Sequence, residues 1–182
     1  YCERGLESSN VILVVASDNP LNTHGLHQFL EYAWSGISSQ HPQAKLRIVG
    51  KVGNCVETDD PQISKTGWVA DLTQEYQTAT IVINPTIAGT GLKIKSVEAL
   101  CHGKPLIAWQ NGVEGISYSG KPPYVKCNSW SEFSGACIRL LSDPVARKEL
   151  EALAIATSEK KFSSQFVYSE LLECLSTVRK GQ

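Results

Sequence analysis

The sequence lacks the features that mark a membrane-spanning or secreted chain. Its longest purely apolar run, residues 11–16, is far shorter than the roughly 20 residues that a membrane span needs. Residues 1–10 are polar and contain no apolar stretch of the kind found in signal peptides. Methionine is absent from all 182 positions, including the first. We therefore expect a portion of a longer protein, with no transmembrane segment in it.

An excess of charge of one sign is also missing. The 17 Lys and Arg residues against 18 Asp and Glu residues give a formal net charge of −1. Proteins that bind nucleic acid through electrostatics show a basic excess or a basic stripe. We therefore expect no nucleic-acid partner.

The six cysteines lack the spacing of a metal site. None of them forms a Cys-x-x-Cys pair, and no histidine stands where a zinc-ligand pattern would need it. A chain of this length can bury a core without disulfides as covalent links. We interpret the cysteines as small, mostly buried apolar side chains in a reducing compartment, and we expect no metal site.

Short apolar runs alternate with longer segments of helical spacing. The runs predict strands at residues 11–16, 45–49, 66–69, 80–85, 105–109 and 124–127. The periodic segments predict helices at residues 23–39, 71–78, 92–102, 131–141, 144–160 and 165–179. The strands are too continuously apolar for a sheet with one solvated face. The pattern predicts a single α/β domain over residues 1–182, a doubly wound parallel sheet with helices on both faces and a helical C-terminal tail.

The two commonest nucleotide-binding loops are absent. A dinucleotide domain needs Gly-x-Gly-x-x-Gly after its first strand, whereas residues 17–25 contain Pro20 and no paired glycines. A Walker A loop is absent as well. Glycines follow the fourth predicted strand instead, in residues 87–95, where a helix begins.

This glycine loop is a candidate anion site. A helix N-terminus offers free N–H groups and the positive end of the dipole, and glycine lets an anion come close. Lys93 and Lys95 add two positive charges that oppose the dipole, and a bound phosphate would remove that penalty. The alternative is an ordinary turn at Gly89 and Gly91 with two solvated lysines.

The helix that follows has two stripes. The apolar stripe, which we expect to face the core, consists of Ile94, Val97, Leu100 and Cys101. The second stripe carries Gly91, Lys95, Glu98 and His102. A carboxylate one turn beyond a phosphate-binding lysine is well placed to accept hydrogen bonds from the vicinal hydroxyls of a sugar. The alternative is a simple Lys95–Glu98 pair worth about 0.3 kcal/mol.

Residues 89–108, Gly-Thr-Gly-Leu-Lys-Ile-Lys-Ser-Val-Glu-Ala-Leu-Cys-His-Gly-Lys-Pro-Leu-Ile-Ala, resemble the donor-binding half of GT-B glycosyltransferases of the family 4 (group 1) type. The resemblance extends from about residue 11 to residue 116, through Asn-x-x-Gly-Leu at 22–26 and Gly-Trp-Val at 67–69. It implies a Rossmann-like carboxyl-terminal domain that binds a nucleotide-diphosphate sugar. It also implies transfer of the sugar to an acceptor, with retention, in the cytoplasm or at the inner membrane face.

The resemblance also assigns residues by position. It implies a diphosphate site at Thr90, Gly91, Leu92 and Lys95, a ribose site at Glu98, and a nucleobase loop at Gly67, Trp68 and Val69. It implies no cofactor or metal and identifies no catalytic residue on this half. The acceptor, which is a sugar, lipid or polysaccharide, would be bound by an amino-terminal domain that this chain lacks. We therefore expect the chain alone to be incomplete and inactive.

Two features depart from the usual family pattern. Thr90 stands where the family has the first of two glutamates, and no Arg and Lys pair follows the first strand near Ser17. Gly91, Lys95 and Glu98 instead match a subgroup variant, Gly-x-x-x-Lys-x-x-Glu-Ala. The alternative function is a non-catalytic module of the same fold that binds a nucleotide or a partner. A sugar phosphorylase, whose phosphate loop also contains Gly-Thr-Gly, is a third class, but no pyridoxal-type lysine environment can be identified.

Overall fold

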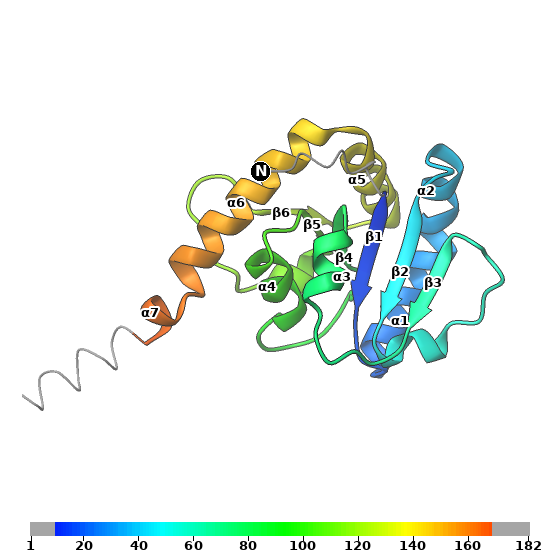
Figure 1. The fold of residues 1–182 in the computed structure, drawn as a ribbon, viewed down its shortest axis with the longest axis horizontal. Coiled ribbons are helices and arrows are strands. Elements are labelled where there is room, and N and C mark those ends of the chain that lie inside the picture. Colours follow the sequence, from blue (N-terminus) through cyan, green and yellow to red (C-terminus); the bar gives the residue numbers. More distant parts are fainter. Residues whose placement is uncertain (1–9, 169–182) are drawn as a thin grey trace, which may run out of the picture.

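A computed structural model describes residues 10–168 of the chain, and its centre is a parallel sheet of six strands. The strands are β1 (Val11–Val15), β2 (Lys45–Val49), β3 (Ile63–Thr66), β4 (Ile81–Asn84), β5 (Leu106–Trp109) and β6 (Tyr124–Cys127). Their order is β3-β2-β1-β4-β5-β6, so the direction of winding reverses between β1 and β4 (Figure 1). This confirms the predicted doubly wound α/β fold.

Helices cover both faces of the sheet (Figure 1). In chain order they are α1 (Pro20–Phe29), the π-helical turn η1 (Leu30–Trp34), α2 (Ser35–Gln40), the 3₁₀ turn η2 (Lys51–Cys55), α3 (Thr73–Thr78), α4 (Ile94–Cys101), the 3₁₀ turn η3 (Gln110–Val113), α5 (Trp130–Ser142), α6 (Pro144–Lys161) and α7 (Ser164–Val167). One face is covered by α1, η1, α2 and α5, and the other by α3, α4 and α6. The helix predicted over 165–179 lies mostly outside the described residues.

Strand β1 shows why its apolar run is continuous. Ile12 and Val14 lie in the core beneath α1 and α5, whereas Leu13 lies in the core beneath α3 and α4. Successive side chains of a strand point to opposite faces of the sheet. Because both faces are covered, both sets of side chains are buried and must be apolar.

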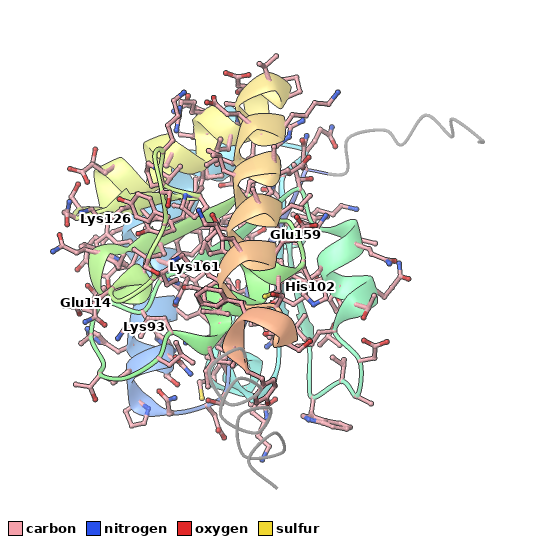
Figure 2. The ribbon with its side chains drawn as sticks, turned by 90° about the vertical axis from the view of Figure 1, so that its left-hand side faces the viewer. Lys93, His102, Glu114, Lys126, Glu159 and Lys161 are labelled. Atoms are coloured by element: carbon pink, nitrogen blue, oxygen red, sulfur yellow. The ribbon has the colours of Figure 1, made fainter. Side chains whose placement is uncertain are left out.

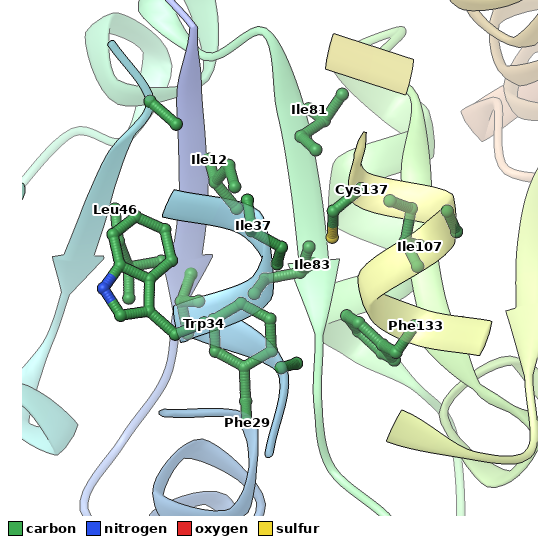
Figure 3. Close-up of a cluster of buried hydrophobic side chains, with 14 of the residues drawn as sticks. Ile12, Phe29, Trp34, Ile37, Leu46, Ile81, Ile83, Ile107, Phe133 and Cys137 are labelled. Atoms are coloured by element: carbon green, nitrogen blue, oxygen red, sulfur yellow. The ribbon is translucent and has the colours of Figure 1, made fainter. Parts of the chain in front are cut away.

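The core beneath α1 and α5 is built around aromatic rings (Figure 3). The ring of Phe29 on α1 lies 5.7 Å from that of Phe133 on α5, and 6.5 Å from those of Trp34 and Trp130. The rings meet edge-on or tilted, which is the favoured geometry for aromatic pairs. These contacts fix the end of α1 against α5.

The first helix begins earlier than the sequence predicts. We expected a helix over residues 23–39, but α1 begins at Pro20. The cap is Asn19, whose side chain accepts a hydrogen bond from the backbone N–H of Asn22. Proline suits the first helical position because its φ is already helical and its missing N–H is not needed there. Asn22 therefore lies in the first turn of the helix.

The predicted third strand was wrong by three residues. The structure has β3 at Ile63–Thr66 instead of 66–69. As an edge strand, β3 pairs with β2 alone, and its side chains are half-buried or exposed. No apolar run marks it for that reason. The correction puts Gly67, Trp68 and Val69 in the loop that follows the strand.

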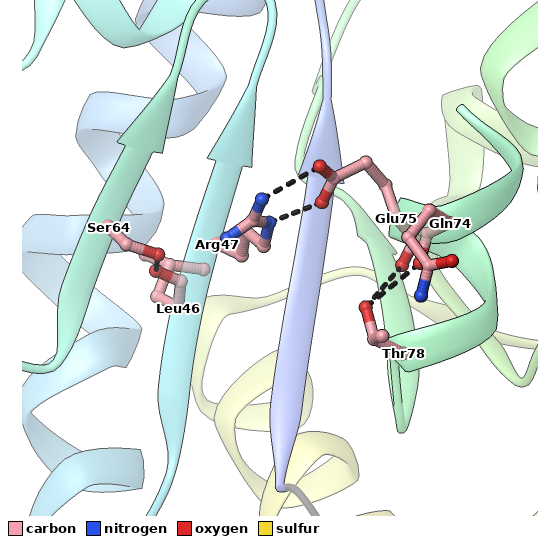
Figure 4. A network of polar contacts seen from close by, with 6 residues as sticks. All are labelled: Leu46, Arg47, Ser64, Gln74, Glu75 and Thr78. Atoms are coloured by element: carbon pink, nitrogen blue, oxygen red, sulfur yellow. Dashed lines mark hydrogen bonds and ion pairs between the residues drawn. The ribbon is translucent and has the colours of Figure 1, made fainter. Parts of the chain in front are cut away.

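Helix α3 is tied to the sheet by an ion pair (Figure 4). The guanidinium of Arg47 on β2 donates two hydrogen bonds to the carboxylate of Glu75, one of them 2.7 Å from Nη2 to Oε1. Such paired bonds fix orientation as well as distance. The hydrogen bond to Glu75 raises the pKa of Arg47, despite the opposing effect of burial. The pair therefore fixes the position of α3 next to β1.

Helix α1 packs so closely on the end of β4 that only glycine fits at position 25. A Cβ atom there would lie 2.4 Å from the carbonyl oxygen of Pro85. We expect Gly25→Ala to destabilise the protein by about 2 kcal/mol or more, because rigid backbone must move. Gly135 is the matched control, an exposed helical glycine of α5 at which an added Cβ atom would have no neighbour within 4 Å. There, alanine should stabilise by up to about 1 kcal/mol. Urea unfolding of both variants checks this, and equal shifts would contradict the packing argument.

Candidate functional site

A cavity of about 400 Å³ opens where the loops after β1 and β4 meet. Its walls come from the end of β1 and the loop after it (Val15, Ala16, Ser17 and Asn19), the first turn of α1, the end of β4 and the loop after it, the start of α4, and Gly112. This is the carboxyl edge of the sheet, at the point where the strand order reverses. Ligands of doubly wound sheets bind at this point.

The loop between β4 and α4 needs its glycines. Gly89 has φ of 136° and Gly91 has φ of 77°, in the region that side chains other than glycine rarely adopt. Thr90 and Leu92, which flank Gly91, line the cavity and are exposed. The predicted glycine turn is therefore present, and it borders the cavity.

Lys95 reaches from α4 across the cavity floor to α1. Its ammonium donates to Oδ1 of Asn22 and to Oγ1 of Thr86, the latter at 3.0 Å. The Thr86 hydroxyl also donates to the same Asn22 oxygen at 3.2 Å. Burial, and then the charge of Lys93, lower the pKa of Lys95 to about 8. Among the described residues, the partners of this ammonium are neutral groups only.

Lys93 is bound on the other side of the glycine loop. Its ammonium donates to the carbonyl of Gly89 at 2.9 Å and to Oδ1 of Asn111 at 3.3 Å. Both lysines line the cavity, and its lining residues, all within the described part of the chain, include no carboxylate. Two uncompensated cations on a glycine loop make this cavity an attractive place for an anion.

The orientation of α4 differs from the sequence prediction. The face that points inward carries Ser96, Ala99 and Leu100, all buried, whereas Ile94 is 68% exposed and Cys101 is exposed. The reason is the Ser96 hydroxyl, which accepts from Nδ2 of Asn84 at 2.9 Å and donates to the carbonyl of Gly112 at 2.6 Å. A serine with both bonds made is stable in a core. The predicted apolar stripe through Ile94 and Cys101 was therefore wrong.

Glu98 lies outside the cavity, on the side of α4 that faces α3. Its Oε2 accepts a hydrogen bond from the hydroxyl of Tyr76 at 3.0 Å. The Lys95–Glu98 ion pair that the sequence left open is not formed, since Lys95 turns toward α1 instead. Lys93 and His102, at opposite ends of α4, lie on opposite sides of α6 in the view of Figure 2.

The predicted nucleobase loop lies apart from the cavity. Gly67 and Trp68 are exposed, Trp68 by 75%, and Val69 is half-buried. They follow β3, which is separated from β1 by β2. The structure therefore spreads the predicted residues along the carboxyl edge of the sheet, with Gly67–Val69 at one end, Glu98 beside α3, and Lys95 with Thr90 and Leu92 at the cavity.

Sequence reasoning missed three residues that contact the lysines. Asn22 and Thr86 accept from Lys95, and Asn111 accepts from Lys93. A signal for them was available, because all three follow the predicted strands at the carboxyl edge of the sheet. Asn22 also belongs to the Asn-x-x-Gly-Leu segment at 22–26.

No metal site accompanies these residues. Among residues 10–168, no group of three or more His, Cys, Asp or Glu side chains could hold a metal ion. Of the four described cysteines, all free, Cys127 and Cys137 are buried, Cys55 is half-buried and Cys101 is exposed. The last of these was expected to be buried, and that prediction was wrong. Within the same range, no helix has both the length and the apolar character to cross a membrane.

The fold and the cavity define the class: a Rossmann-like α/β domain with a cationic cavity at the reversal of strand order. The family model described as glycosyl transferases group 1 matches residues 9–143, about three quarters of the chain. The chain belongs to this family.

Several known proteins are similar to this chain. A relative described as an uncharacterized 44.6 kDa protein in the cps region of Klebsiella pneumoniae is 23% identical over an alignment of 184 positions, which covers 95% of this chain and 47% of the relative. HepE of Anabaena, solved with UDP and glucose, has a TM-score of 0.75 and 17% identity over 94% of this chain and 49% of that one. TarM of S. aureus has a TM-score of 0.74 and 14% identity over 95% of this chain and 36% of that one.

A further structure has the same extent as this chain. The carboxyl-terminal domain of a glycosyl transferase group 1 family protein, LpcC from Francisella tularensis, has a TM-score of 0.63 and 16% identity over 85% of this chain and 86% of that one. The similarity shows that the fold is that of one half of a GT-B glycosyltransferase, as the sequence resemblance implied. The chain spans about half the length of the curated relative that it matches.

The burial of Lys95 predicts an unusual pH dependence of stability. An unfolded lysine has a pKa near 10.4, whereas Lys95 in the folded chain has a pKa of about 8. Between these values the unfolded chain binds more protons, so this group makes the free energy of unfolding rise with pH, by about 2 kcal/mol from pH 8 to pH 10. Below pH 8 Lys95 is protonated in both the folded and the unfolded chain, so its destabilising effect on the fold no longer changes with pH. Lys95→Met should remove the rise and be at least as stable as wild type at pH 7.

Chemical unfolding at pH 7, 8, 9 and 10 measures this difference between wild type and Lys95→Met. Lys126→Met is the control, because Lys126 is an exposed lysine on the edge strand β6, away from the cavity. Parallel stability curves for wild type and Lys95→Met would show that Lys95 is not a buried, unpaired cation.

Proposed function

We propose that this chain binds a nucleotide-diphosphate sugar and is the donor-binding part of a glycosyltransferase. The observation that carries the proposal is the half-buried ammonium of Lys95, which lies in a cavity at the reversal of strand order and whose partners within residues 10–168 are all neutral. A group 1 family match and the complexes of HepE with UDP and glucose support the same ligand class. A diphosphate would supply the negative charge that the cavity lacks.

The donor would lie along the carboxyl edge of the sheet. The nucleobase would contact Gly67, Trp68 and Val69, and the ribose hydroxyls would donate to Glu98. The diphosphate would bind at Lys95 and at the loop of Thr90, Gly91 and Leu92. The remaining volume of the cavity would hold the sugar. The base, ribose and diphosphate would thus follow one another along the sheet edge, from the loop after β3 to the loop after β4.

The chemistry proposed for this half is stabilisation of the leaving group. When the bond between sugar and diphosphate breaks, negative charge develops on the diphosphate, and the ammonium groups of Lys93 and Lys95 line the cavity where it would form. With two lysines in that place, we propose that donor binding needs no metal. Retention, the acceptor (a sugar, lipid or polysaccharide) and a cytoplasmic location, with or without contact to the inner membrane face, stay predictions.

A non-catalytic binding module is the second candidate. Thr90, instead of glutamate, follows Gly89 at the cavity. Without that carboxylate, the site could bind the nucleotide without orienting a hexose for transfer. The two candidates share the nucleotide site and differ only in turnover.

We predict that the 182-residue chain binds a nucleoside diphosphate but transfers no sugar by itself. The residues that we propose to bind the nucleotide are on this chain, whereas the chain spans 47% of its curated relative. Calorimetric titration with UDP, GDP, ADP, CDP and dTDP measures binding, and release of nucleoside diphosphate from nucleotide sugars in the presence of acceptors measures turnover. Turnover by the isolated chain would contradict the incomplete-enzyme part, and binding of none of the five would contradict the whole proposal.

Lys95 and Glu98 should have separable roles in binding. If Glu98 accepts from the ribose, Glu98→Ala should lower nucleoside-diphosphate affinity at least tenfold, equivalent to about 1.5–3 kcal/mol for a charged hydrogen bond. Binding of inorganic phosphate, which has no ribose, should be unchanged. Lys95→Met should weaken ligands in proportion to their phosphate charge, and the loss should shrink as salt rises.

Titration of both variants with nucleoside, nucleoside diphosphate and phosphate separates these roles. Neither variant should unfold, because neither side chain is on the buried face of Ser96, Ala99 and Leu100. Glu149→Ala is the control, since it removes an exposed carboxylate of α6 that pairs with Lys121, away from the cavity. Equal affinities for wild type and Glu98→Ala would remove the ribose assignment.

A further inference from the structure

Tyr76 connects α3 to the carboxylate of Glu98. Its hydroxyl donates to Oε2 of Glu98 at 3.0 Å, and its side chain is 1% exposed. Its ring lies flat against the imidazole of His102, with centroids 4.2 Å apart and planes at 9°. The preceding residue, Glu75, is held by Arg47 on β2. Tyr76 is therefore fixed from three directions while its one proton points to Glu98.

The hydrogen bond from Tyr76 occupies one of the two carboxylate oxygens of Glu98. Burial, and then the charge of Glu98, raise the pKa of Tyr76, so the phenol remains a donor throughout the ordinary pH range. A carboxylate has two acceptor oxygens. Oε2 accepts from Tyr76, and Oε1 has no hydrogen-bond partner among the residues that the structure describes. One oxygen is therefore anchored and the other is available to a ligand.

We propose that Tyr76 is a positioning residue for ribose recognition: by holding Oε2 of Glu98, it keeps Oε1 ready to accept a ribose hydroxyl. This inference rests on the proposed function and adds a residue on a different helix to the ribose site. Without the anchor, the long glutamate side chain would sample several rotamers and lose that freedom on binding. Tyr76 therefore acts through Glu98 and does not itself touch the nucleotide.

The experiment uses Tyr76→Phe, which removes the hydroxyl and keeps the ring that stacks on His102. The ligands are UDP and 2′,3′-dideoxyuridine diphosphate, or the same pair with whichever base the titration above selects. They share the base and the diphosphate and differ only in the ribose hydroxyls. Wild type should prefer UDP. In Tyr76→Phe, the affinity for UDP should fall about three- to tenfold, and the affinity for the dideoxy nucleotide should stay the same.

Two further variants separate positioning from a structural role. In a Glu98→Ala background, Tyr76→Phe should have no further effect on UDP affinity, because its target is gone. Tyr124→Phe is the matched control, since Tyr124 is also a buried tyrosine, on the edge strand β6, and should leave both affinities unchanged. Thermal unfolding of each variant establishes that it is folded.

The outcomes distinguish this inference from the proposed function. If wild type prefers UDP and Tyr76→Phe keeps that preference, the inference is overturned and the ribose site at Glu98 stands. Equal losses for both nucleotides would likewise overturn it, because a merely structural bond between α3 and α4 would weaken every ligand alike. If wild type binds neither nucleotide, the proposed function fails, and the inference fails with it.

Discussion

The candidate site depends on one buried contact, the hydroxyl of Ser96. It accepts from Asn84 at the end of β4 and donates to the carbonyl of Gly112 beyond β5, so it fixes the rotation of α4 about its own axis. With that rotation set, Lys95 turns toward α1 and the cavity, and Glu98 turns toward α3. A rotation of α4 that buried Ile94 instead would take both side chains away from these partners. The polar core contact therefore determines the geometry of the charged groups.

The cavity illustrates how a binding site differs from the rest of the fold. Elsewhere in the described part of the chain, two basic side chains pair with carboxylates, Arg47 with Glu75 and Lys121 with Glu149. Lys95 is held by an amide and a hydroxyl, and its ammonium is destabilised enough for its pKa to fall to about 8. A buried cation without a carboxylate lowers stability in the empty protein. An anionic ligand would reverse that cost, which is the reason to regard the arrangement as a site and not as part of the core.

The sequence predicted the sheet because a strand buried on both faces leaves a continuous apolar run. It predicted the glycine loop because Gly89 and Gly91 take positive φ, which other residues rarely adopt. The sequence prediction failed where a buried polar group is hydrogen-bonded by a residue that is distant in the sequence. Ser96 is buried because Asn84 and Gly112 bind it, and no local pattern records such bonds. Edge strand β3 was misplaced because it has no buried face to mark it. The Tyr76–Glu98 contact joins two helices and has no signature in spacing.

A crystal structure of this chain with UDP tests the central claim most directly, because it locates the anion relative to Lys95. The account predicts a diphosphate oxygen within hydrogen-bond distance of the Lys95 ammonium, about 3 Å, inside the cavity between the loops after β1 and β4. The ribose would lie against Glu98, outside that cavity and beside α3. A diphosphate bound elsewhere on the chain, with Lys95 still held by Asn22 and Thr86 and by nothing else, would contradict it.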